Sequence, residues 1–163
     1  MILLKIFDPQ LTILETLFSV ITARNTGFFT VNMKALHEMN QLLLSLIMFI
    51  GGGPGSNVGG IRVMVFLILI LTTIANLKGQ EDVVVHYRSI QDKVIKKAIT
   101  ILSIDLWIVF VGMLGLTLTE NHSILDTAFY VISTFSNTGL TTIDLETLTT
   151  AGKWISIFIM YIG

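Results

Sequence analysis

The chain has 163 residues, of which 53% are hydrophobic and 13% are charged, and its mean hydropathy is +0.81. Soluble domains carry about a quarter charged residues, so this composition predicts an integral membrane protein. The net charge of −1 provides no basic surface for nucleic acid, and the absence of cysteine excludes disulfides, thiolate metal sites and thiol catalysis. The apolar segments are long enough to form helices in a bilayer, so we predict an all-α membrane fold.

The first predicted element is a short helix over residues 9–22, with Asp8 as its N-cap and Pro9 in its first turn. This helix is too short to span a bilayer, and it runs into the polar residues 22–27. A short helix followed by a polar turn is typical of a re-entrant pore loop, whose backbone must be buried in protein or face water.

The second predicted helix covers residues 36–50, and helix is expected again from Ile61 to about Leu77. Between them, residues 51–60 read Gly-Gly-Gly-Pro-Gly-Ser-Asn-Val-Gly-Gly and break the crossing in its middle. Because each half-helix is too short to span alone, we favour an intramembrane gating loop over a flexible extramembrane linker. The predicted gate comprises Gly51, Gly52, Gly53, Pro54, Gly55, Ser56, Asn57, Gly59 and Gly60, with Arg62 just beyond it. Arg62 lies either beside the permeation path or at the cytoplasmic interface, where its side chain would snorkel.

The segment 78–97 is the densest basic loop of the chain, so the positive-inside rule predicts that it is cytoplasmic. Its basic residues are Lys78, Arg88, Lys93, Lys96 and Lys97. The next crossing runs outward over 94–119, and its apolar part, 98–119, is long enough to span a hydrocarbon core of about 30 Å. Residues 30–36 and 119–126 are then expected to face the outside.

A second short helix is predicted over 123–135, followed by a turn over 136–142 and an inward helix over 150–163. This helix repeats the first one, because residues 15–27 read ETLFSVITARNTG and residues 126–139 read DTAFYVISTFSNTG. Both copies keep Thr-x-Phe-x-Val-Ile and end in Asn-Thr-Gly, with one residue inserted in the second copy. Repeated turns can surround an ion with backbone carbonyls, and glycine permits the backbone angles that this requires. The alternative for either turn alone is a helix C-cap, where Asn and Gly are also common.

Three segments carry a resemblance to a known family: FSVITARNTGFFTVN (18–32), FIGGGPGSNVGGIRV (49–63) and FYVISTFSNTGLTT (129–142). In their order and spacing, the chain resembles the pore subunits of the Trk–Ktr–HKT potassium-transporter superfamily. The resemblance implies four repeats of outer helix, pore helix and inner helix around one pseudo-fourfold pore, and this chain would be the C-terminal part. Residues 1–77 would form the pore helix, filter and broken inner helix of the third repeat. Residues 78–97 would be a cytoplasmic loop, and 98–163 the fourth repeat, truncated in its inner helix.

The resemblance also implies the roles of particular residues. The selectivity-filter positions would be Asn25, Thr26, Gly27, Phe28, Asn137, Thr138, Gly139 and Leu140. Potassium would be the ion bound and transported there, with sodium or protons as candidate coupling ions and no other cofactor. Gly51–Gly60 would block the path below the filter and move on activation. A cytoplasmic nucleotide-binding regulatory subunit of the Ktr or Trk type would control the pore, and two pore subunits would form a homodimer in the plasma membrane.

Three alternatives stay open at this point. The first is a sodium-selective member of the same family, because the first two filters are absent from the chain. The second is a non-conducting accessory or incomplete membrane fragment, because two repeats cannot close a fourfold pore. The third is an intramembrane hydrolase using Ser56 with a histidine, but His37, His86 and His122 all fall near predicted membrane ends. We therefore predict a potassium transporter rather than an enzyme.

Overall fold

The computed structural model describes all residues of the chain except 1, 25, 54–58, 80–83 and 86–87. The described residues form, in chain order, α1 (Ile2–Phe7), α2 (Ile13–Thr22), the 3-10 helix η1 (Met33–Ala35), α3 (Glu38–Phe49), α4 (Val63–Leu77), β1 (Val84–Val85), β2 (Arg88–Ser89), α5 (Asp92–Thr119), α6 (Ile124–Phe135), the 3-10 helix η2 (Leu145–Thr147) and α7 (Thr150–Ile162). This part of the chain is helical apart from β1 and β2, which pair antiparallel within the loop 78–97. The sequence did not indicate this short ladder.

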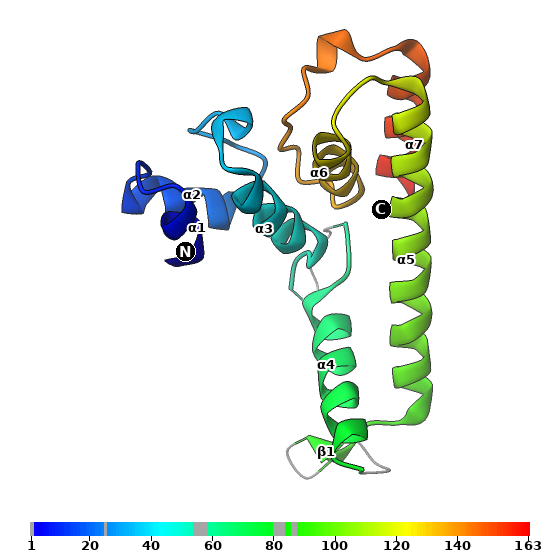
Figure 1. The fold of residues 1–163 in the computed structure, drawn as a ribbon. Coiled ribbons are helices and arrows are strands. Elements are labelled where there is room, and N and C mark those ends of the chain that lie inside the picture. The colour runs from blue at the N-terminus through cyan, green and yellow to red at the C-terminus, as the bar shows by residue number, and fades with distance from the viewer. Residues whose placement is uncertain (1, 25, 54–58, 80–83, 86–87) are drawn as a thin grey trace.

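The long helix α5 forms one side of the molecule (Figure 1). Helix α4 packs along its first half, and α6 and α7 pack along its second half. Helix α6 also packs against α3, and α1 and α2 lie at the edge beyond α3. In the part of the chain that the structure describes, α5 is the one helix long and apolar enough to cross a membrane. Only 17% of its most apolar window is buried, whereas a core helix of a soluble protein is mostly buried.

The first short helix begins later than the sequence predicted, and the assignment of Asp8 as its N-cap is wrong. Helix α2 starts at Ile13, and Thr12 is the N-cap. The Thr12 backbone N–H donates to Glu15 Oε2 at 2.8 Å, and the Glu15 N–H donates to Thr12 Oγ1 at 3.4 Å. This capping box satisfies two backbone donors at once, which a single Asp cap does not. Asp8 instead follows the separate helix α1, where its N–H donates to the Leu4 carbonyl.

The elements around the two Asn-Thr-Gly turns have the same order in both halves of the chain. Helices α1, α2, η1 and α3 of the first half correspond in order to α5, α6, η2 and α7 of the second half. Asp8, the residue after α1, donates its backbone N–H to Leu4 O at 3.1 Å. Glu120, the residue after α5, donates its backbone N–H to Leu116 O at 2.8 Å. Leu4 and Leu116 are both buried. Helix α1 therefore occupies the place of the last turns of α5, a correspondence that the sequence repeat alone did not reveal.

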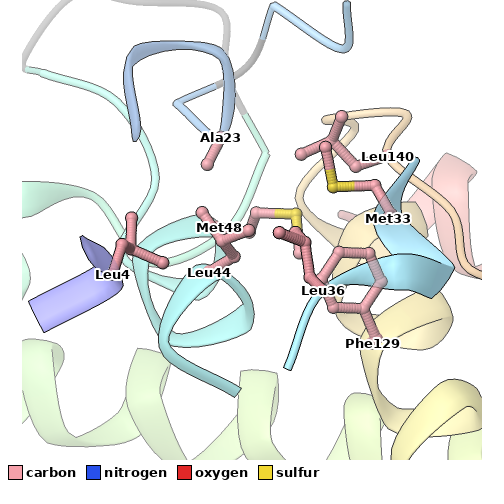
Figure 2. Close-up of a cluster of buried hydrophobic side chains, with 8 residues drawn as sticks. All are labelled: Leu4, Ala23, Met33, Leu36, Leu44, Met48, Phe129 and Leu140. Carbon is pink, nitrogen blue, oxygen red and sulfur yellow. The ribbon is translucent and has the colours of Figure 1, made fainter. Parts of the chain in front are cut away.

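Two hydrophobic clusters form the core of the described residues. The first contains Leu4, Ala23, Met33, Leu36, Leu44, Met48, Phe129 and Leu140 (Figure 2). Its last two members come from α6 and the second turn, so this cluster joins the two halves. The second contains Val109, Leu116, Tyr130, Val131, Phe135, Ile143, Leu148 and Ile159, all from the second half. Burial of large apolar side chains such as Phe129 and Phe135 stabilises each cluster by about 1.5–3 kcal/mol per side chain.

Helix ends at Phe49 and begins again at Val63, two residues later than predicted. The two ends of the intervening segment are hydrogen-bonded to each other. The Ile61 N–H donates to Phe49 O at 3.1 Å, and the Val63 N–H donates to Gly52 O at 3.2 Å. Ile50 and Ile61 form an isolated parallel bridge. The segment is thus closed at its base, and α3 and α4 leave it in different directions (Figure 1).

Candidate functional site

The two Asn-Thr-Gly turns are held by corresponding backbone hydrogen bonds. The Thr26 N–H donates to Thr22 O at 3.1 Å, and the Thr138 N–H donates to Ser133 O at 3.0 Å. Thr22 and Ser133 are equivalent, because each directly follows the Val-Ile pair of its repeat. The residue inserted in the second copy is therefore accommodated between the acceptor and the turn, which leaves Thr-Gly in the same relation to helices α2 and α6. Asn25 lies outside the described residues.

Both turns need the left-handed backbone region. Gly27 has φ +72° and Gly139 has φ +91°. Most residues with a Cβ avoid this region, and glycine enters it freely. Asn137 has φ +54°, and its N–H donates to Thr134 O at 3.2 Å. Together with the Thr138 bond this is a Schellman arrangement, so Asn137 closes helix α6 as the C-cap alternative expected, whereas Gly139 lies beyond the cap.

The two turns meet backbone to backbone, although they are far apart in the sequence. A Cβ placed on Gly27 would clash with the carbonyl oxygen of Thr138. A Cβ placed on Gly139 would lie 3.8 Å from the Gly27 Cα. A side chain at position 27 is therefore incompatible with this contact, and the absence of one allows the Thr138 carbonyl to face the first turn.

The end of the glycine-rich segment packs against the start of the second turn. A Cβ on Gly59 would lie 2.7 Å from Phe135 O and 3.0 Å from the Ser136 carbonyl carbon. Gly60 has φ +82°, and its Cβ would lie 3.1 Å from Phe49 O. The three segments singled out in the sequence, the two turns and the loop between α3 and α4, thus converge on one place.

The equivalent side chains of the two turns have different surroundings. Phe28 is 69% exposed, whereas Leu140 is 1% exposed and packs in the first cluster (Figure 2). The Thr138 and Ser136 hydroxyls lie 2.7 Å apart in a buried hydrogen bond, while Thr26 is exposed. The likeness between the turns therefore lies in their backbones, which is where a carbonyl-lined site would need it.

Other predicted gate residues are placed only in part. Pro54, Gly55, Ser56 and Asn57 lie outside the described residues. Gly51 is buried, Gly52 is half-buried, and Gly53 is exposed. Arg62 is the exposed N-cap residue of α4, and its carbonyl accepts the N–H groups of the first helical turn. Its guanidinium forms no ion pair with a described residue.

The sequence did not indicate an ion pair between the segments that follow the two turns. Lys34 Nζ lies 2.6 Å from Asp144 Oδ2, which joins η1 to the N-cap of η2. A groove of about 390 Å³ runs between residues 29–34 and 141–144. The Thr142 hydroxyl is buried there without a hydrogen-bond partner among the described residues. Extending the repeat past Asn-Thr-Gly aligns η1 with η2, but this alignment does not indicate the Lys34–Asp144 pair.

The chain matches a family of cation transport proteins. Residues 6–126 match the family model TrkH, described as cation transport protein, and the chain belongs to this family. It is 38% identical over 146 residues to the Ktr system potassium uptake protein B of Bacillus subtilis (strain 168). It is 31% identical over 148 residues to the Ktr system potassium uptake protein D of the same strain. It is 30% identical over 153 residues to the potassium/sodium uptake protein NtpJ of Enterococcus hirae.

These alignments cover 90–91% of this chain and 33–34% of the relatives. The chain therefore spans about a third of the length of the curated relatives that it matches. Members of the family are membrane-embedded ion transporters and not enzymes, so the hydrolase alternative is not carried further.

Proposed function

We propose that this chain contributes part of a potassium uptake path, in which backbone carbonyls of the two Asn-Thr-Gly turns replace the water around the ion. The observation that carries the proposal is the contact between Gly27 and the Thr138 carbonyl. A potassium ion leaves water only where carbonyl oxygens of similar field strength receive it, and several backbone segments must converge to supply them. Gly27 and Gly139 provide the backbone angles, and Asn25, Thr26, Phe28, Asn137 and Leu140 complete the two filter segments.

The loop Gly51–Gly60, with Arg62, is the gate in this proposal. Support comes from the close packing of Gly59 on Phe135 and Ser136, directly before the second turn. A loop whose base is closed by hydrogen bonds can move as a unit, and any movement of Gly59 changes what lies against the turn. The loop therefore blocks the path in one position and opens it in another.

The remaining parts of the proposal concern the surroundings of the path. Helix α5 crosses the plasma membrane, and the basic loop 78–97 lies on the cytoplasmic side. A nucleotide-binding regulatory subunit binds on that side, in keeping with the relatives that are named as parts of a Ktr system. Two pore subunits form a homodimer. Sodium or protons are the candidate coupling ions.

A second candidate function is sodium-permeable uptake by the same path. The name of the Enterococcus hirae relative, a potassium/sodium uptake protein, favours it. The backbone carbonyls of the two turns can bind either ion. The cage that these carbonyls form would decide which ion is preferred.

The test is growth of potassium-import-deficient bacteria on low potassium. The cells express either the chain or a chimera in which it replaces the matching third of the Bacillus subtilis Ktr protein B. We expect the chimera to restore growth, with uptake that sodium does not inhibit. Uptake that sodium inhibits would favour the second candidate. A chimera that reaches the membrane at the level of the Bacillus protein but restores no growth would contradict the proposal and favour a non-conducting role.

A further inference from the structure

An acidic side chain in the first half fastens two helices that the pore loop separates. The Asp8 carboxylate, just after α1, accepts the N–H of His37, the N-cap of α3, at 3.0 Å. The Asn40 amide donates to the same Asp8 oxygen at 2.7 Å and to the Leu4 carbonyl at 2.8 Å. Asn40 is fully buried. The start of the inner helix α3 is thus tied to the end of the outer helix α1.

The second half contains the same connection with different residues. Glu120 Oε1, at the C-cap of α5, accepts the N–H of Thr149 at 2.8 Å and its hydroxyl at 2.7 Å. Thr149 is the N-cap of α7 and receives the Gly152 N–H on its hydroxyl oxygen. Glu120 is 8% exposed, and its carboxylate lies at the N-terminus of α7, where the helix dipole favours negative charge.

The two connections are equivalent by position. In both, the carboxylate and the N–H that it accepts are 29 positions apart in the sequence, and the pore helix and the Asn-Thr-Gly turn lie between them. The insertion in the second turn is offset by a link to the pore helix that is one residue shorter, from Glu120 to Ser123 rather than from Asp8 to Thr12. The loop closed by the carboxylate therefore keeps its length.

The residue pairs also compensate for side-chain size. Asn40 and Gly152 are the third residues of their helices, α3 and α7. The short Asp8 is supported by the Asn40 amide, whereas a Cβ on Gly152 would clash with Glu120 Oε1. The longer acid thus fills the space that glycine leaves, so each half reaches the same hydrogen bond by a different combination.

We propose that Asp8 and Glu120 are positioning residues of the two pore loops. Each carboxylate fixes both ends of a loop that carries one filter turn, and so sets how close that turn stands to its neighbour. This role rests on the proposed function of the turns. The carboxylates touch no ion in the path. They act through the N-cap residues His37 and Thr149.

The test replaces the Glu120 and Gly152 pair of the second half with the acid and amide pair found in the first half. Glu120→Asp is one methylene too short to reach Thr149, and Glu120→Asp/Gly152→Asn copies the pair found in the first half. Glu146→Ala is the matched control, because Glu146 is an exposed acid on η2 without a side-chain hydrogen bond in the described structure. Two quantities are measured: amide hydrogen exchange at Thr149 in the 163-residue chain in micelles, and the potassium-to-sodium uptake ratio of the chimera.

We expect Glu120→Asp to speed exchange at Thr149 by about tenfold or more, the loss that follows from removing a hydrogen bond to a charged acceptor. It should also lower the uptake ratio, and the double variant should recover both quantities. Exchange at Thr149 no faster than in Glu146→Ala would overturn the connection. Faster exchange with an unchanged uptake ratio would overturn the positioning role. If no chimera transports either ion, the proposed function fails, while exchange at Thr149 still decides whether the connection exists.

Discussion

Replacing Gly27 with alanine tests two features of the first turn: its left-handed backbone conformation and its contact with the second turn. At φ +72° an L-residue costs about 1–2 kcal/mol. The added Cβ would also clash with the Thr138 carbonyl oxygen, and forcing packed groups apart costs about 1–3 kcal/mol. Gly27→Ala should therefore lower the free energy of unfolding by about 2–5 kcal/mol in total.

Two glycines of the same chain provide matched controls. Gly79 has φ +67° and no described atom within 4 Å of a Cβ, so Gly79→Ala carries the backbone cost alone. Gly53 also has open space and lies outside the left-handed region, so Gly53→Ala carries neither cost. Unfolding in mixed detergent and dodecyl sulfate micelles, followed by circular dichroism, ranks the three. The reasoning is refuted if Gly27→Ala destabilises the protein no more than Gly79→Ala.

Three further predictions concern the other contacts of the site. Gly59→Ala should raise basal potassium uptake by the chimera, because its Cβ displaces the loop from the backbone before the second turn; Gly79→Ala, outside this loop and with no described atom within 4 Å of its Cβ, should leave uptake unchanged, and equal uptake in the two variants would argue against the gate. Gly139→Ser should lower the preference for potassium over sodium, because φ +91° strains any residue with a Cβ, and an unaltered ratio in ion-competition assays would remove Gly139 from the filter. The Lys34–Asp144 pair is exposed, so a double-mutant cycle to alanine should give a coupling of less than about 1 kcal/mol that shrinks with added salt, and a larger, salt-independent value would contradict this.

The sequence predicted the helix boundaries well where an apolar run ended at glycines or began after a good N-cap residue. Glycines mark the end of α3, and Ser123 precedes α6 as its N-cap. The start of α2 was misplaced because Asp8-Pro9 and Thr12 compete as helix-start signals. The Thr-x-x-Glu pattern at Thr12 was present in the sequence, and its two reciprocal hydrogen bonds decide the outcome.

The contacts among the two turns and the glycine-rich loop could not be predicted in the same way. Asn-Thr-Gly identifies a turn, but nothing local to it states that the Thr138 carbonyl lies against Gly27. The six glycines within residues 51–60 likewise do not reveal that Gly59 packs against Phe135, since that requirement comes from the packing of distant backbone. The equivalence of Asp8 and Glu120 was hidden because the two acids differ in length and α1 has only six residues.

The most direct test of the account is the potassium-to-sodium permeability ratio of the purified chimera in liposomes, measured with Gly27 and Gly139 intact, singly replaced by alanine, and both replaced. The account predicts a preference for potassium in the parent that each replacement reduces. It also predicts that the effect of the double replacement differs from the sum of the single ones, because residues in contact do not act independently. An unchanged ratio in variants that remain folded and conducting would contradict the claim that these two turns line the path.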